Sequence, residues 1–331
     1  MKKVLYLVAV LFTGALTLVS CDKNNNEGEG EGPLDEDVKT ATVDSRAYNK
    51  WIYFKFSDGS TVEHEIEPIG GTYNGALNYS LSLPNGTTNE GSSEDQKLEI
   101  SRVDENTVKI TLKDFKSGNQ SMGDIETEAT VSVAKSKWTV KAENKDVGGY
   151  TISCDGTIES NTNINLNMSI TVKAMQAMGM GPIKATYQGA MEQSANVDES
   201  TFDWDIAFHS YDKKTNGGSV LATTEKEIAD VTTIPTGDYI QDIKSDSLIV
   251  NMGGMMDENI GIGYAQGSVN EVLSAATLRD LSNMPPLYSK TDLVYIVKTK
   301  SGEYAKIKFT DYMDEEGNKG VFTFKYVYPV K

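Results

Sequence analysis

The chain has 331 residues, a formal net charge of −17, and 31 Lys and Arg against 48 Asp and Glu. Such an acidic surface argues against nucleic acid as a partner, because phosphate binding depends on neutralisation by Lys and Arg. It argues equally against electrostatic binding to anionic lipid through a cluster of basic residues. The length suffices for two domains of the usual size, about 150 residues each.

The first 20 residues have the pattern of a secretory signal peptide. Lys2 and Lys3 precede an apolar run over residues 4–19, which is too short for a good membrane-spanning helix. The run ends in Leu18-Val-Ser-Cys21, which resembles a lipobox, where the cysteine becomes the lipidated first residue. No second apolar run follows, so we predict that acylated Cys21 is the sole membrane anchor. The alternatives are a plain signal peptide that ends near a cysteine and a short membrane helix.

Residues 21–40 are predicted to form a flexible tether. They are polar and glycine-rich, with too few apolar side chains to offset the entropy of ordering. The acidic residues after Cys21 resemble the surface-export signals of Bacteroidetes lipoproteins, although Lys23 interrupts them. We therefore expect a lipid-anchored protein of the outer membrane whose folded body faces the cell surface.

The cysteine and histidine content narrows the possible chemistry. With Cys21 acylated, Cys154 has no disulfide partner. We interpret it as a small buried apolar side chain, with a reactive thiol as the alternative. The two histidines, His64 and His209, have no metal-ligand neighbours at zinc-type spacing. The chain also lacks a Gly-x-Ser-x-Gly motif, a phosphate loop and a Cys-His motif, so we do not expect an enzyme.

Most of the chain after residue 40 alternates between apolar and polar residues, as strands do. The clearest alternating segments are residues 51–56, 108–112, 129–133, 138–142, 150–154 and 163–172. Turn signals such as Asp58-Gly59 and Gly148-Gly149 separate them. This pattern predicts an all-β fold, either an antiparallel sandwich or a barrel.

A second set of strands is predicted after residue 200. Residues 204–209 alternate and place Trp204, Ile206 and Phe208 on one face. A C-terminal meander follows at residues 294–298, 304–309 and 321–328. Its last strand has four aromatic residues on one face, which we interpret as core packing; they are Phe322, Phe324, Tyr326 and Tyr328.

One helix is predicted, over residues 268–281. Ser268 fits an N-cap, Glu271 lies three residues later, and Pro285-Pro286 follows the expected end.

Several segments resemble the HmuY family of haem-binding lipoproteins from Bacteroidetes. They are Ala47-Tyr-Asn-Lys-Trp-Ile-Tyr-Phe-Lys-Phe56, Trp204-Asp-Ile-Ala-Phe-His-Ser-Tyr-Asp212, Lys214-Thr-Asn-Gly-Gly218, Ser301-Gly-Glu-Tyr-Ala-Lys-Ile-Lys308 and Gly320-Val-Phe-Thr-Phe-Lys-Tyr-Val-Tyr328. The resemblance covers residues 41–67 and 195–331. It implies an antiparallel β domain that scavenges haem for iron acquisition.

The residues between these segments resemble the calycin-like (lipocalin-like) domains of Bacteroidetes lipoproteins. The matching segments are Gly71-Thr-Tyr-Asn-Gly75, Gln96-Lys-Leu-Glu-Ile100, Ile110-Thr-Leu-Lys-Asp-Phe115, Met122-Gly-Asp-Ile125, Cys154-Asp-Gly-Thr-Ile158 and the strand at 164–172. We therefore predict an HmuY-like domain of residues 41–67 and 191–331, interrupted by a small barrel of residues 68–190. Loops tolerate long insertions because closure entropy grows slowly with length. The alternative is two domains in series, with residues 41–67 forming the first strand of the barrel.

The HmuY resemblance implies two axial side chains on the haem iron, either two histidines or two methionines. No histidine follows His209, which excludes a bis-His site in the second half. The haem-binding candidates are therefore methionines in Asn-Met-Gly-Gly-Met-Met and Asn-Met-Pro-Pro, namely Met252, Met255, Met256 and Met284. Thioether sulfur is a soft ligand that favours ferrous iron. We predict Met284 together with Met256 or Met255 as the iron ligands; core packing is the alternative.

Three further groups are candidates for supporting roles. The lysines at positions 298, 300, 306 and 308 would suit haem propionates, although a solvated strand face is the favoured interpretation. Methionines 175, 178 and 180 cluster at the end of the predicted barrel, where they could close a ligand pocket or touch the other domain. His209 is interpreted as a structural histidine within a strand.

Together these observations predict an outer-membrane lipoprotein that binds haem and delivers it towards a TonB-dependent receptor. The alternative is a lipoprotein without haem, which binds a small apolar ligand or a partner protein through its calycin-like barrel.

Overall fold

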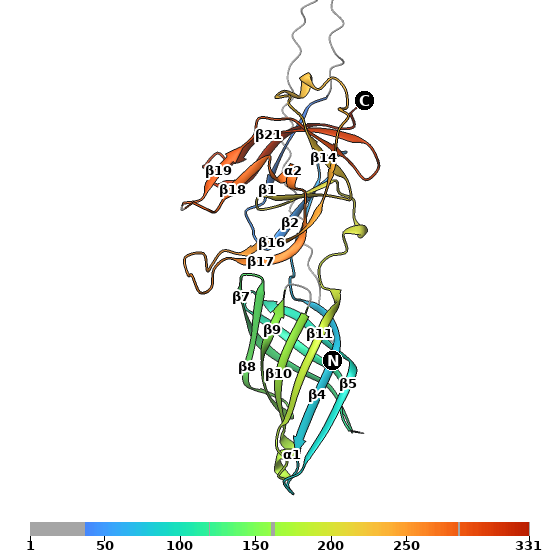
Figure 1. Ribbon diagram of the computed structural model, residues 1–331, viewed down its shortest axis with the longest axis vertical. Coiled ribbons are helices and arrows are strands. Elements are labelled where there is room, and N and C mark those ends of the chain that lie inside the picture. Colours follow the sequence, from blue (N-terminus) through green and yellow to red (C-terminus); the bar gives the residue numbers. More distant parts are fainter. Residues whose placement is uncertain (1–36, 119, 160–162, 284, 331) are drawn as a thin grey trace, which may run out of the picture. The chain divides into compact units, whose positions relative to one another are not determined.

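The structure is a computed structural model that describes residues 37–118, 120–159, 163–283 and 285–330. Strands dominate the described residues, and the two α-helices among them are short, α1 (Lys173–Ala177) and α2 (Glu271–Ser274) (Figure 1). The predicted all-β class is therefore confirmed. None of the described helices is long and apolar enough to cross a membrane. The signal peptide, Cys21 and most of the predicted tether lie outside the described residues.

Eight consecutive strands close into an antiparallel barrel. They are β4 (Gly71–Ser82), β5 (Thr88–Asp104), β6 (Thr107–Ser117), β7 (Gln120–Ala134), β8 (Lys137–Val147), β9 (Tyr150–Glu159), β10 (Asn163–Val172) and β11 (Ile183–Ser194). Each strand pairs with its neighbour in sequence, and β11 returns to pair with β4. This eight-strand barrel fits the predicted calycin-like domain.

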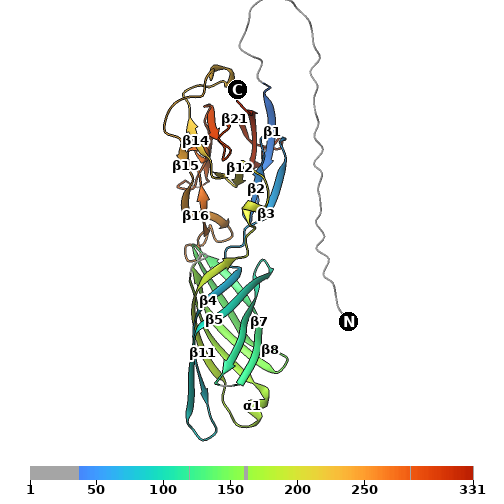
Figure 2. The same ribbon diagram turned by 90° about the vertical axis from the view of Figure 1, so that its right-hand side faces the viewer.

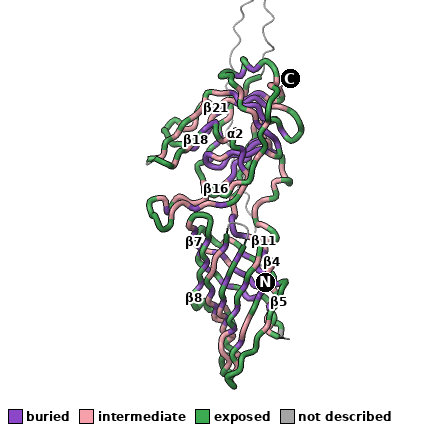
Figure 3. The backbone as a smooth tube through the Cα atoms, in the orientation of Figure 1, coloured by how far each residue is buried: buried purple, intermediate pink, exposed green. Residues whose placement is uncertain are grey.

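Alternation along the strands fills the barrel. On β10, Ile164, Leu166, Met168 and Ile170 are buried, while the residues that alternate with them are exposed or partly exposed. The largest fully buried side chains of the barrel core are Tyr73, Tyr187 and Phe115. The buried tyrosines keep their hydroxyls satisfied, since Tyr187 Oη donates to the Gln96 carbonyl at 3.1 Å. Figure 3 shows buried backbone alternating with exposed backbone along these strands.

Cys154 lies in this core, and burial raises the pKa of its thiol to about 11. Because alkylating reagents attack the thiolate, we expect Cys154 to resist N-ethylmaleimide in the native protein and to react once the chain is unfolded. Mass spectrometry of a Cys21→Ser chain, before and after urea, measures this. Modification of the native chain at the rate of an exposed thiol would contradict the assignment.

Two further sheets pack face to face (Figure 2). The six-stranded sheet contains β1 (Lys39–Asp44), β22 (Lys319–Val327), β21 (Tyr304–Met313), β20 (Tyr295–Lys298), β14 (Ser219–Ala222) and β15 (Ile240–Gln241), in that order. The four-stranded sheet contains β13 (Asp212–Thr215), β12 (Ile206–His209), β2 (Lys50–Phe54) and β3 (Thr61–Glu65).

The strands that precede the barrel in sequence pair with strands that follow it. Strand β1 pairs with β22, and β2 pairs with β12. Strand β1 begins at Lys39, so the last two residues of the predicted tether belong to a strand. The pairing pattern agrees with an insertion, while the predicted domain boundaries themselves stay predictions.

Aromatic rings fill the space between these two sheets. Phe324 on β22 lies 5.2 Å from Phe54, 5.7 Å from Phe208 and 5.6 Å from Phe309, measured between ring centroids. The aromatic face predicted for the last strand is confirmed, because Phe322, Phe324 and Tyr326 are buried there.

The opposite face of β2 and β12 carries a smaller core, and here the prediction for Trp204 is wrong. Trp204 precedes strand β12, which begins at Ile206. Its ring packs edge-on against Tyr53 at 4.9 Å, beside Trp51 and away from the core that holds Ile206 and Phe208. The strand period therefore does not extend back to Trp204.

Two hairpins leave this part of the fold. The first is formed by β16 (Ile243–Asn251) and β17 (Gly263–Val269), and the second by β18 (Thr277–Asp280) and β19 (Leu287–Lys290). Both project to the left in Figure 1. Short helix α2 connects them, so the predicted helix over 268–281 is wrong: Ser268 belongs to β17, and pairing with β19 makes residues 277–280 a strand.

Candidate functional site

Three of the four predicted haem-binding methionines lie together in the turn between β16 and β17. Met256 is 80% exposed, while Met252 and Met255 are half-buried. The turn is compact, because the Met255 amide donates to the Met252 carbonyl at 3.1 Å. A Cβ on Gly254 would lie 2.3 Å from the Gly261 carbonyl oxygen, so only glycine allows this close approach.

Met284 lies outside the described residues. Its place in the sequence is between β18, which ends at Asp280, and β19, which begins at Leu287. The predicted iron ligands therefore belong to the connecting segments of two different hairpins.

Both hairpins expose large apolar side chains. Ile260 accompanies Met256 on the first hairpin, and Leu278 and Leu287 are exposed on the second, at 49% and 57%. Exposed apolar side chains that gather on projecting elements are typical of a docking surface for an apolar partner or ligand.

The structure corrects the interpretation of the four lysines. Strands β20 and β21 pair, as predicted, but Lys306 is only 2% exposed and does not belong to a solvated face. Lys308 forms an ion pair with Glu227 at 2.7 Å. Lys298 and Lys300 are exposed.

His209 is fully buried, with its Nε2 atom 2.8 Å from the Tyr48 carbonyl oxygen and its ring 5.2 Å from that of Trp51. This environment suits the structural role that the sequence suggested.

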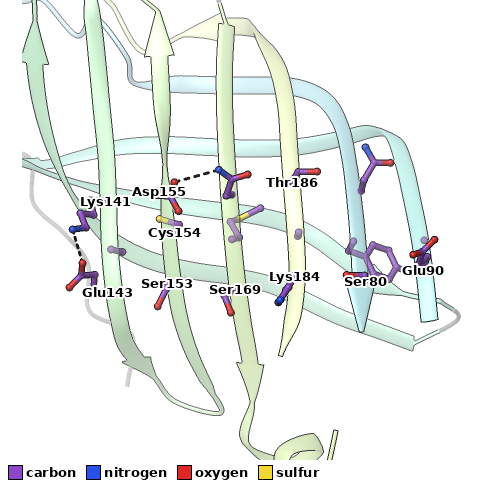
Figure 4. A pocket seen from close by; sticks show the side chains of 17 residues that line it. Ser80, Glu90, Lys141, Glu143, Ser153, Cys154, Asp155, Ser169, Lys184 and Thr186 are labelled. Atoms are coloured by element: carbon purple, nitrogen blue, oxygen red, sulfur yellow. Dashed lines mark hydrogen bonds and ion pairs between the residues drawn. The ribbon is translucent and has the colours of Figure 1, made fainter. Parts of the chain in front are cut away.

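The barrel has its own methionines and its own hollow. Met175, in helix α1, and Met180, shortly after it, pack against the barrel core, whereas Met178 is 59% exposed. A hollow of about 680 Å³ on the barrel wall is lined by residues of six neighbouring strands (Figure 4). Several of its polar groups pair with one another, including Lys141 with Glu143 at 2.6 Å. Of the methionines predicted to bind iron, the three that the structure describes, Met252, Met255 and Met256, do not line it.

Sequence reasoning missed the buried lysines at positions 213 and 214. Both have less than a tenth of their surface exposed, although lysine is rarely buried. Lys213 Nζ donates to the hydroxyl of Thr277, the first residue of β18. Lys214 packs among aromatic rings on the other face of the same strand. No pattern in the sequence distinguishes them from surface lysines.

The fold and the two hairpins define an all-β protein that combines a closed barrel with a sandwich bearing exposed apolar hairpins. The chain belongs to the HmuY family, since the family described as HmuY protein matches residues 47–326. No curated protein matches the chain.

Three solved structures are similar to this chain. One is described as an HmuY-like heme binding protein from Bacteroides vulgatus, with 20% identity, a TM-score of 0.46, and coverage of 91% of this chain and 96% of that chain. Another is the apo HmuY analog of Tannerella forsythia, at 21% identity, TM-score 0.46, covering 91% and 100%. A third is apo PinO from Porphyromonas gingivitis, at 19%, TM-score 0.46, covering 89% and 99%.

Proposed function

We propose that the chain is a haem-binding lipoprotein and that its two hairpins hold the haem. The observation that carries the proposal is the exposed methionine turn of β16–β17, within a chain of the HmuY family. Met256 is exposed to an incoming ligand, and thioether sulfur is a suitable haem-iron ligand.

The donor set of the hairpins fits haem. Met252, Met255 and Met256 supply thioethers in one turn, and Ile260 with Leu287 supplies apolar contact area for a flat macrocycle. Met284 is the proposed ligand from the second hairpin, with Met256 the proposed ligand from the first. Bound haem would supply the iron, and this chain would bind and orient it rather than catalyse a reaction.

Haem titration tests the proposal directly. We expect the mature chain, made soluble by Cys21→Ser, to bind haem one-to-one and to bind ferrous haem more tightly than ferric haem, because thioether ligation favours the ferrous state. Absorbance titrations with and without dithionite measure both affinities. A lack of saturable binding in both oxidation states would overturn the proposal.

The ligand assignment has a matched control on the barrel. Met256→Ala should weaken ferrous haem binding about tenfold, which corresponds to about 1.4 kcal/mol. Met178→Ala also removes an exposed methionine, but from the barrel, and it should leave the affinity unchanged. Equal effects of the two substitutions would remove Met256 from the site.

The proposal extends to location and delivery. Acylation of Cys21 would anchor the protein at the outer membrane, and a TonB-dependent receptor would be the recipient of the haem. Metabolic labelling with an alkyne fatty acid tests the anchor: label should appear on the wild-type chain and be absent from Cys21→Ser.

A further inference from the structure

Strand β13 is an edge strand, and residues at the base of both hairpins bond to its free side. We call these bases, where the hairpin strands begin and end, the hairpin roots. Strand β13 pairs with β12 on one side only. On its other side, the Lys213 amide donates to Ser274 Oγ at 2.8 Å, and the Lys213 carbonyl accepts from the Asn270 amide at 2.7 Å. Two residues on, the Thr215 amide donates to the carboxylate of Asp242 at 2.8 Å. The exposed edge of the sheet is thus covered by hairpin roots.

The root of the first hairpin is held by a buried polar network. Asp242 directly precedes β16, and Asn270 directly follows β17. The Asn270 side-chain amide donates to Asp242 Oδ1 at 3.0 Å and to the Ile240 carbonyl at 2.9 Å. Thr215 Oγ1 donates to the same Asp242 oxygen at 2.9 Å. These bonds join both ends of the hairpin to β13.

Lys213 is one of the residues that hold the second hairpin. Its Nζ atom donates to the hydroxyl of Thr277, the first residue of β18, at 2.6 Å. It also donates to the Tyr211 carbonyl at 3.0 Å. Thr277 is fully buried, so its bond to Lys213 is shielded from water. Arg279 on β18 also donates to the Tyr48 hydroxyl at 2.9 Å, and Tyr288 on β19 packs against the Tyr211 ring at 5.3 Å.

The surroundings of Lys213 suit a neutral amine better than an ammonium ion. The side chain is fully buried, and its two hydrogen-bond acceptors match the two N–H groups of a neutral amine. Strands β21 and β22 contribute aromatic rings, with Nζ 5.4 Å from the Phe309 centroid and 4.5 Å from that of Phe322. Their faces attract an ammonium ion, but they supply no hydrogen-bond acceptor for its third N–H group. Helix α2 contributes the neutral Ser274. Asp212, on the same strand, is the charge that acts on Lys213, and it only partly opposes burial, which lowers the pKa to about 7.

We propose that Lys213 is the positioning residue that fixes the β18–β19 hairpin relative to β13, and that protonation of its amine loosens this hairpin and weakens ligand binding. The inference rests on the proposed haem function for its ligand, but not for the motion itself. An ammonium ion has a third N–H group and a full charge in an apolar core, and moving towards water relieves both. That movement breaks the bond to Thr277, which anchors the start of the hairpin.

The direction of the pH effect follows from this geometry. As the pH falls through the lowered pKa of Lys213, the charged form becomes populated, the hairpin is released from this anchor and ligand affinity falls. Above that pKa the neutral form predominates, and the anchored hairpin binds more tightly. Ligand binding therefore displaces a proton from Lys213 near neutral pH.

Amide hydrogen exchange tests the motion without any ligand. We expect protection of residues 277–290, corrected for the intrinsic exchange rate, to fall about tenfold between pH 8 and pH 6 in the full mature chain. Lys213→Met should show no such fall. Thr277→Val, which removes the acceptor with little change of shape, should be poorly protected at both pH values. A fall of equal size in wild type and Lys213→Met would overturn the proposal.

Two controls separate this result from general effects of pH. Lys306→Met removes another buried lysine, on β21, and should keep the wild-type pH response. The β8–β9 hairpin of the barrel serves as an internal reference and should not respond.

Haem titration at the same two pH values then links the motion to binding. The wild-type affinity should fall about tenfold at pH 6, and the affinity of Lys213→Met should not. Absence of haem binding at both values would overturn the haem function, whereas binding with an identical pH response in both proteins would overturn the role of Lys213.

Discussion

Phe324→Ala is expected to lower the free energy of unfolding by about 3–5 kcal/mol, the range for removal of a fully buried phenylalanine. Phe324 is 0% exposed and contacts rings from both sheets of the sandwich, including Phe54 and Phe208 on one sheet and Phe309 on its own. The residual cavity would border rigid aromatic rings, which cannot collapse into it easily. Urea unfolding, followed by tryptophan fluorescence, measures the loss.

A control on the same part of the fold isolates the effect of burial. Val62 lies on edge strand β3 and is 37% exposed. Val62→Ala should change the stability by no more than about 0.5 kcal/mol. If the two substitutions cost the same, the packing between the sheets does not dominate the stability of this domain.

Glu199→Ala is expected to cost about 2 kcal/mol, the second-largest effect on stability. Glu199 Oε1 accepts from Lys214 Nζ at 2.5 Å and from the Tyr53 hydroxyl at 2.9 Å. The Lys214 side chain is 7% exposed and Glu199 is 39% exposed, so solvent screening reduces the full penalty of a broken buried pair. Without Glu199, a buried cation loses its counter-ion.

The aromatic rings around Lys214 provide the complementary experiment. Its Nζ atom lies 4.2 Å from the Trp51 ring centroid and 5.1 Å from that of Tyr53. The double variant Glu199→Ala with Lys214→Met places an apolar side chain among those rings and should recover most of the lost stability. Chemical unfolding of all four proteins completes the cycle. A double variant as unstable as Glu199→Ala would show that the pair matters through its shape and not through its charge.

Strand patterns in the sequence were a sound guide where each strand has one buried face. Residues 163–172 form a strand with the predicted bounds, because Ile164, Leu166 and Ile170 all face the barrel core. The all-β class follows from many such segments. The prediction for Trp204 is wrong because the chain bends before β12, and alternation between two faces holds only within a continuous strand.

The predicted helix failed for a different reason. Ser268 and Glu271 form a plausible local capping pattern, yet Asn270 is the observed cap, and α2 ends at Ser274. Strand pairing of Thr277 with Lys290 stabilises an extended conformation. Long-range pairing therefore overrides a local helix signal that spans only a few residues.

Part of the candidate site could also be predicted from the sequence, and part of it could not. The methionines at positions 252, 255 and 256 are neighbours in sequence, so their clustering was readable before folding. Their exposure to solvent could not be predicted from the sequence, because any one of them could have been a core residue. No sequence pattern predicted that the two lysines are buried. The hydrogen bond between Lys213 and Thr277, for example, joins residues of two different strands.

The sequence by itself determined the acidic character of the chain, its content of only two cysteines, and the alternation that makes it all-β. These properties depend on composition or on residues a few positions apart. Only the tertiary structure decided which strands close the barrel, which methionines reach the surface, and which lysines are buried on β13. Those outcomes depend on contacts between residues far apart in the chain, and the free energy of such contacts exceeds the local preference of any single segment.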